Sequence, residues 1–286
     1  MKRSSKLTMQ QYIENHPYLA ETINLRAGIE NILAERVEKV TLTDTNAVKD
    51  LVRDGKPLLQ QEKLRELVVK SAALWLPEVL EPLKKLTMPE PMQAALNSLA
   101  SKEKELAAAE KETAFRLLLT QQDEKLAELL AKYQLNETLF RTIGWAIIDA
   151  LIPGELKNSD LWDSVHWARN YCPVCGRLPV MAQLRKEKQG RARFFSCDGC
   201  HTAWQHKRVG CVYCGNDDLK EMHILEIEGE PLMRLDVCDK CHTYLKTYDG
   251  EGLENIYLKD YATLHLDLLA EREELTKKGS VLMPVK

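Results

Sequence analysis

The stretch Cys172-Pro-Val-Cys175-Gly176 decides how the second half of this chain folds, and Cys211-Val-Tyr-Cys214-Gly215 repeats it. A second cysteine pair follows each stretch, in Cys197-Asp-Gly-Cys200-His-Thr and Cys238-Asp-Lys-Cys241-His-Thr. All eight cysteines therefore fall in C-x-x-C pairs, and the pairs form two copies of a repeat. A repeat of about 40 residues indicates one structural unit per copy.

The paired cysteines predict two metal sites. Two cysteines separated by two residues can bind one metal ion, and two such pairs complete a tetrahedron of sulfurs. We expect each copy of the repeat to close one site. The expected ligands are Cys172, Cys175, Cys197 and Cys200 in the first site, and Cys211, Cys214, Cys238 and Cys241 in the second. Zinc and iron both accept four thiolates, so the two metal ions are iron or zinc.

Other uses of paired cysteines fit this chain less well. Structural disulfides need an oxidising compartment, but the start of the chain carries charge without the apolar run of a secretory signal. The pattern C-x-x-C-H at 197–201 and 238–242 matches haem attachment, yet it leaves the other two pairs unused. A thiol oxidoreductase needs a low-pKa cysteine that is free of metal. We therefore expect a cytoplasmic protein with reduced thiols.

Each copy of the repeat reads as a hairpin that carries the cysteines. Residues 222–227 and 232–237 alternate partially in polarity around the turn Glu228-Gly229, and residues 180–184 and 193–196 are their counterparts. Two cysteine turns on a hairpin form a zinc-ribbon or rubredoxin-like unit. Such a unit has little core of its own, so its metal supplies much of its folding free energy.

The first 168 residues are nearly free of strand signals and predict helices. We expect the prolines, Pro77 and Pro82 among them, to separate these helices. No catalytic constellation stands out, and His16, directly before Pro17, is expected to be a turn residue. The expected helices cover residues 64–76, 92–106, 115–133 and 138–151, with a solvated helix at 101–113 and a last helix at 261–274.

The predicted fold class is α+β: an N-terminal all-helical domain, two tandem zinc-ribbon or rubredoxin-like units, and a C-terminal helix. The expected boundaries are 1–168 for the helical domain, 169–209 and 210–248 for the ribbons, and 249–286 for the C-terminal helix and tail. No run of about 18 apolar residues occurs, so we expect no membrane span.

Charge is concentrated on the first ribbon. The chain carries a formal net charge of -3, which argues against bulk affinity for nucleic acid or membrane. Residues 172–208 carry eight Lys or Arg against two acidic residues, whereas residues 211–248 carry four against eight. Phe194, Phe195 and Trp204 lie among the basic residues, as in a base-stacking platform. A nucleic-acid-binding ribbon protein is therefore the alternative function, although such a tract would be expected to follow both ribbons.

Two further interpretations of the basic residues remain. Arginines near a four-thiolate site offset its negative charge. The same residues would also form a docking surface for an acidic protein partner. The candidates for partner contacts are Arg185, Lys186, Lys188, Arg191 and Arg193.

The ribbon region resembles the formate dehydrogenase accessory protein family (FdhE). Four segments carry the resemblance, which is close over residues 170–270 and faint over the helical half. They are Tyr171-Cys-Pro-Val-Cys-Gly-Arg-Leu-Pro-Val180, Arg193-Phe-Phe-Ser-Cys-Asp-Gly-Cys-His-Thr-Ala-Trp204, Arg208-Val-Gly-Cys-Val-Tyr-Cys-Gly215 and Val237-Cys-Asp-Lys-Cys-His-Thr-Tyr-Leu-Lys246.

The resemblance implies a cytoplasmic accessory or maturation factor, not an enzyme. It implies rubredoxin-like iron in the four-cysteine sites. It also implies binding to the catalytic subunit of a molybdenum- or tungsten-dependent formate dehydrogenase, whose activation the protein would support.

Overall fold

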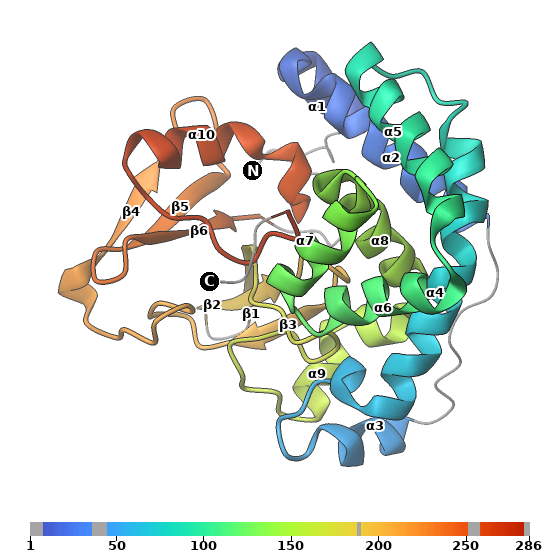
Figure 1. The fold of residues 1–286 in the computed structure, drawn as a ribbon. Helices are drawn as coiled ribbons and strands as arrows, with labels where there is room; N and C mark the ends of the chain where they lie inside the picture. Colours follow the sequence, from blue (N-terminus) through green and yellow to red (C-terminus); the bar gives the residue numbers. More distant parts are fainter. Residues whose placement is uncertain (1–7, 36–44, 188–189, 251–257, 283–286) are drawn as a thin grey trace.

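The computed structural model describes residues 8–35, 45–187, 190–250 and 258–282. Helices make up one side of the molecule and a sheet the other, with the C-terminal helix α10 lying over part of the sheet (Figure 1). The helices are α1 Met9–Asn15, α2 Ala20–Ala34, α3 Thr45–Val52, α4 Glu62–Leu83, α5 Glu90–Lys102, α6 Ala108–Leu119, α7 Asp123–Lys132, α8 Glu137–Leu151, α9 Ser159–Ser164 and α10 Leu264–Arg272. Among the described residues, no helix has the length and apolar character needed to cross a bilayer.

Helix α4 is longer than the sequence predicted, because Pro77 and Pro82 lie inside it instead of ending it. A proline inside a helix removes a backbone hydrogen bond and costs about 3 kcal/mol. Burying one large apolar side chain contributes about 1.5–3 kcal/mol, and this stretch of α4 buries several. Those side chains are Trp75, Leu76, Val79, Leu80 and Leu83. Tertiary packing therefore carries the helix through both prolines.

Two other helix predictions need correction. The predicted helix 115–133 is divided, because Gln121 takes a left-handed conformation at φ 55° and the N–H of Gln122 donates to the carbonyl of Leu117 at 3.0 Å. This 6→1 bond closes α6 as a Schellman motif does. The predicted solvated helix 101–113 is also interrupted between α5 and α6. There Glu103 is buried and ion-paired with Lys111.

The sheet has six strands in the order β3-β2-β1-β6-β5-β4. Both predicted hairpins are present as antiparallel pairs, β1 with β2 and β4 with β5. Each ribbon adds a third strand after its second cysteine pair, and the parallel pairing of β1 with β6 joins the two ribbons into one sheet. The strands are β1 Met181–Glu187, β2 Gly190–Ser196, β3 Ala203–His206, β4 Met222–Glu226, β5 Met233–Cys238 and β6 Thr243–Tyr248.

The two ribbons contribute mainly to different hydrophobic clusters. The cysteines of the first ribbon lie in the same apolar cluster as α4, α6 and α8. Most of the buried apolar residues of the second ribbon lie in a smaller cluster, in which Met233, Leu235 and Tyr244 pack against Leu266 and Ala270 of α10. Val180 and Met181 of the first ribbon also belong to this cluster. The predicted C-terminal helix is thus confirmed, although the α-helix itself begins at residue 264 and ends at 272.

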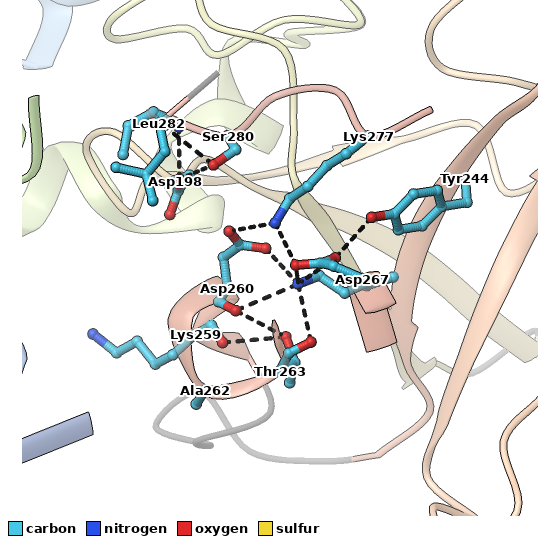
Figure 2. A network of polar contacts seen from close by, with 12 residues as sticks. Asp198, Tyr244, Lys259, Asp260, Ala262, Thr263, Asp267, Lys277, Ser280 and Leu282 are labelled. Atoms are coloured by element: carbon cyan, nitrogen blue, oxygen red, sulfur yellow. Dashed lines mark hydrogen bonds and ion pairs between the residues drawn. The ribbon is translucent and has the colours of Figure 1, made fainter. Parts of the chain in front are cut away.

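A buried ion network fastens α10 to the second ribbon (Figure 2). Lys246 of β6 is only 1% exposed, and its Nζ lies 2.5 Å from Asp260 and 3.1 Å from Asp267. Lys277 binds the same two carboxylates at 2.9 and 2.5 Å, and the hydroxyl of Tyr244 donates to Asp267 at 2.8 Å. Burial raises the pKa of Asp260, but Lys246 and Lys277 outweigh it and hold that pKa below its usual range.

Candidate metal centres

The first cysteine pair of each ribbon sits in a tight backbone turn. The N–H of Gly176 donates to the carbonyl of Cys172 at 2.9 Å, and that of Gly215 donates to Cys211 at 3.0 Å. The two glycines have φ values of 81° and 74°, a conformation that glycine adopts without a steric penalty. The glycine after each first pair therefore allows both sulfurs of the pair to face one point.

The second cysteine pair makes the same turn with a histidine. In the first ribbon the N–H of His201 donates to the carbonyl of Cys197 at 3.0 Å. His201 and His242 have φ values of 50° and 51°, and histidine is among the residues that tolerate this region. The histidines of the C-x-x-C-H pattern are thus turn residues. His201 is further held by Asp149 of α8, whose carboxylate lies 3.1 Å from its Nδ1.

The structure brings together the two cysteine groups expected from the repeat. In each group the four Sγ atoms all lie within 4.8 Å of one another. In the first site, Cys172–Cys200 and Cys175–Cys197 are both 3.4 Å apart. In the second, the Sγ–Sγ distances are 3.6 Å for Cys211–Cys241 and 3.8 Å for Cys214–Cys238. A metal bound to four sulfurs at 2.3 Å separates them by about 3.8 Å, so both groups fit such an ion.

The first site is built into the helical core. All four of its cysteines are buried. The backbone around the first pair is bound by Leu58 and Leu59, whose N–H groups donate to the carbonyls of Pro173 and Val174 at 2.9 and 2.8 Å. Trp145 of α8 packs directly on Gly199, between the cysteines of the second pair.

The second site lies at the surface of its ribbon. Cys214 is exposed and Cys241 is partly exposed, while Cys211 and Cys238 are buried. Between its first two cysteines, Val212 is buried in the apolar cluster of the helical half, and the side chain of Asn170 donates to the carbonyl of Val212 at 2.9 Å.

Burial and hydrogen bonding set the proton affinities of the thiols. Burial raises the pKa of Cys175 and Cys197 well above the usual value, and that of Cys241 to about 12. Burial acts in the same direction on Cys200, but hydrogen bonds from the other cysteines and from Thr202 outweigh it and lower that pKa. Because a metal binds thiolates, its binding at the first site would be coupled to proton release.

Two threonines, which the spacing of the cysteines does not single out, lie within hydrogen-bond distance of the sulfurs. The hydroxyl of Thr202 lies 3.1 Å from Sγ of Cys200, and that of Thr243 lies 3.0 Å from Sγ of Cys241. The signal was present in the sequence, since both copies read Cys-His-Thr. Hydrogen bonds to sulfur tune the stability and redox properties of metal–thiolate sites.

The five basic candidates for partner contacts differ in exposure. Lys186 and Arg191 are exposed, although Arg191 also pairs with Asp249. Arg185 is partly exposed and lies over the ring of Phe194 at 4.0 Å. Arg193 is buried and donates to the carbonyls of Lys207 and Gly210, so it has a structural role. Lys188 lies outside the described residues.

The aromatic residues of the first ribbon face its interior. Phe194 is 5% exposed, and Phe195 and Trp204 are fully buried. A stacking platform for bases needs exposed ring faces, and these rings are covered by protein. The aromatic residues that favoured a nucleic-acid-binding ribbon therefore offer no exposed ring faces for bases in the folded chain.

Comparisons with known proteins agree on one family. The family model for the central domain of FdhE matches residues 171–208. The FdhE homolog of Aquifex aeolicus (strain VF5) is 33% identical over 114 residues, which cover 39% of this chain and 40% of that protein. The homolog of Cronobacter sakazakii is 30% identical over 138 residues, 47% and 42% of the two chains. These matches span less than half the length of the curated relatives.

A solved structure has the same fold. The crystal structure of the FdhE protein from Pseudomonas aeruginosa matches with a TM-score of 0.62, covering 96% of this chain and 92% of that chain. The sequence identity is 20%.

Proposed function

We propose that the chain is a member of the FdhE family and a metal-binding accessory factor of formate dehydrogenase, which its similarity to FdhE proteins supports. It binds the catalytic subunit of a molybdenum- or tungsten-dependent enzyme in the cytoplasm and supports its activation. The observation that carries this proposal is the pair of four-cysteine groups, in which the sulfurs are already gathered at the spacing of metal ligands.

The two metal ions, iron or zinc, would be held by Cys172, Cys175, Cys197 and Cys200, and by Cys211, Cys214, Cys238 and Cys241. A metal with four protein sulfurs has no open coordination position, so it is structural or transfers electrons and does not act as a Lewis acid. We therefore assign the protein a role in maturation and no small-molecule substrate. Metal analysis with a visible spectrum tests this: an iron-loaded protein should be red when oxidised and bleach on reduction.

The exposed basic residues of the first ribbon are the proposed contact with the client. Lys186 and the partly exposed Arg185 lie at the end of β1, and Arg191 lies at the start of β2. Lys188, outside the described residues, remains a candidate from the sequence. A groove of about 710 Å³ lies beside the start of β2 and is lined by Arg191 and by the exposed Lys207 and Arg208. Such a cluster attracts an acidic surface and speeds the encounter more than it tightens the final complex.

The binding experiment compares two triple variants of the full chain. Arg185→Ser, Lys186→Ser and Arg191→Ser should slow capture of a formate dehydrogenase catalytic subunit about tenfold at low salt, and less at high salt. The control replaces Lys63, Lys70 and Lys125, which are exposed on α4 and α7, and removes the same charge. Equal slowing in both variants would remove the basic residues of the first ribbon from the contact. Failure of the unmodified chain to bind the subunit, or co-purification of RNA in its place, would contradict the proposed function.

A further inference from the structure

Three side chains from distant parts of the chain meet away from the cysteines. His16 lies between α1 and a 3₁₀ turn at Pro17–Leu19, Glu230 lies in the β4–β5 connection, and His265 lies in the first turn of α10. One ligand-type atom from each lies within 4.8 Å of the others. Nε2 of His16 and Nε2 of His265 are 2.5 and 3.3 Å from the same carboxylate oxygen, Oε1 of Glu230. The three side chains are only 12, 10 and 14% exposed, in the order His16, Glu230, His265.

The surroundings of His16 place its Nε2 against a carboxylate oxygen, where a neutral ring has no hydrogen to donate. Nδ1 lies 3.0 Å from the carbonyl oxygen of Tyr12, and a carbonyl only accepts, so Nδ1 carries the hydrogen. In a neutral imidazole the other nitrogen then has a lone pair, and here it faces a carboxylate oxygen at 2.5 Å. Two lone pairs repel at this distance. Either a proton between the two atoms, on the ring or on the carboxyl group, or a metal ion beside them removes the repulsion.

The surroundings of the cluster favour the metal ion. Nδ1 of His265 is buried without a hydrogen-bond partner, and its Nε2 faces Oε1 of Glu230 at 3.3 Å; the unpartnered nitrogen is costly to bury unless a ligand binds the ring. The ring of His16 is held by stacking on Tyr12 at a centroid distance of 4.2 Å. An imidazole that donates from one nitrogen to a backbone carbonyl and presents the other nitrogen inward is the usual arrangement of a metal-bound histidine.

We propose that His16, Glu230 and His265 form a third metal site, which takes a divalent transition ion such as Zn²⁺. Two imidazole nitrogens and one carboxylate oxygen suit zinc, and three protein ligands leave a fourth position for water. Tetrahedral ligands at zinc–nitrogen distances lie about 3.3 Å apart, which matches the His265–Glu230 contact of 3.3 Å. The His16–Glu230 contact of 2.5 Å is shorter, so these two side chains must move apart by about 0.8 Å when the ion binds. The exposed Tyr18 has its ring centroid 6.0 Å from His16 and 6.1 Å from His265, so the site lies close to solvent.

A metal ion at this site would stabilise the fold. It joins the N-terminal helix to the second ribbon and to α10, which are otherwise separate in sequence. An ion that binds only the folded chain stabilises it in proportion to the logarithm of its concentration. Zinc should therefore raise the unfolding temperature even when both cysteine sites are already filled.

The test counts metal in the full-length protein. After equilibration with Zn²⁺ and removal of free ion, the unmodified chain should hold one equivalent more than His16→Ala, Glu230→Ala or His265→Ala. The matched control is His223→Ala, because His223 also pairs with a carboxylate, Asp239 at 3.0 Å, but is 46% exposed and has no third ligand among the described residues. This control should keep the full count. An equal count in all five proteins would overturn the proposal.

Cobalt gives a second measurement that needs no variant. Co²⁺ bound by cysteines produces sulfur-to-metal charge-transfer bands, whereas Co²⁺ bound by nitrogen and oxygen shows only d–d bands. Once the charge-transfer bands are saturated, a further equivalent should add d–d absorption alone. If no such equivalent binds, the cluster is a hydrogen-bonded contact only and the third site does not exist, whatever the folding state of the variants.

Discussion

The two four-cysteine regions have the same local structure and opposite surroundings. Both use C-x-x-C turns with one glycine and one histidine at positive φ. The first site is fully buried and lies in the apolar cluster of the helical half, whereas Cys214 of the second site is exposed. The repeat thus specifies a ligand set, and the packing around it decides how far solvent reaches that set. We expect the first site to support the whole fold and the second to exchange its metal more readily.

The largest expected effect comes from removing one cysteine pair at a time. Cys172→Ala with Cys175→Ala should remove one metal and destabilise the helical half by about 5 kcal/mol or more, because the ligands lie inside its core. Cys211→Ala with Cys214→Ala should remove the other metal and leave the helical half folded. Metal content and far-ultraviolet circular dichroism on heating measure both effects. Loss of both metals from either variant would contradict the pairing.

The stability of the second ribbon depends on its buried ion network, whereas that of the first ribbon depends on packing against the helical core. Lys246→Ala leaves Asp260 and Asp267 buried with one lysine fewer, and we expect a cost of about 3–5 kcal/mol. Hydrogen exchange should locate the loss in β5, β6 and α10. The control is Arg53→Ala, which removes an exposed ion pair with Asp50 and should cost less than about 1 kcal/mol. A loss spread evenly over the helical half would show that the two cores are not separate.

The same network predicts an acid dependence. The pKa of Asp260 is held below its usual range, so its stabilising contribution is complete above the unfolded pKa of about 3.9 and is lost as pH falls below it. Asp260→Asn cannot lose this contribution on acidification. Urea unfolding at pH 5 and pH 3.5 should therefore show a steeper loss of stability for the unmodified chain than for the variant. Parallel losses would mean that other carboxylates dominate.

The glycine turns allow a smaller, matched comparison of the two sites. Alanine at either position would be strained by about 1–2 kcal/mol, because its Cβ disfavours positive φ. At Gly176 the added Cβ would also lie 2.7 Å from Gln60 and 3.1 Å from Pro57, whereas at Gly215 nothing lies within 4 Å. Gly176→Ala should therefore lower the urea midpoint more than Gly215→Ala. Equal midpoints would indicate that the first turn is less tightly enclosed than its packing suggests.

The smallest expected effect concerns the two threonines. Thr202→Val removes the threonine hydroxyl that lies against the sulfur of the buried Cys200. No water replaces it there, so the variant should lose about 1–2 kcal/mol of stability. Thr243→Val removes one beside the partly exposed Cys241, where water can substitute, so its cost should be lower. Thermal unfolding of the metal-loaded proteins measures both, with Thr202→Ser as the variant that restores the hydrogen bond. A larger loss at Thr243 would reverse the comparison.

Local spacing explains why so much of the cysteine region was predictable. A C-x-x-C pair followed by glycine or by His-Thr forms its turn from neighbouring residues, and the hairpins follow from alternation around a short turn. Helical periodicity likewise predicts helices at 138–151 and 261–274, close to the observed α8 and α10. These elements depend on contacts between residues that are near in sequence.

The remaining features depend on residues that are far apart in sequence. The parallel pairing of β1 with β6 joins the ribbons, and the core around α4 carries that helix through Pro77 and Pro82. The burial of Arg193 and of the ribbon aromatics, and the meeting of His16 with His265, likewise arise only on packing.

The sequence by itself determined which cysteines share a site, because the repeat encodes each ligand set and its turns. Only the tertiary structure decided that one set is enclosed and the other reaches solvent, because burial is set by what the rest of the chain packs against it.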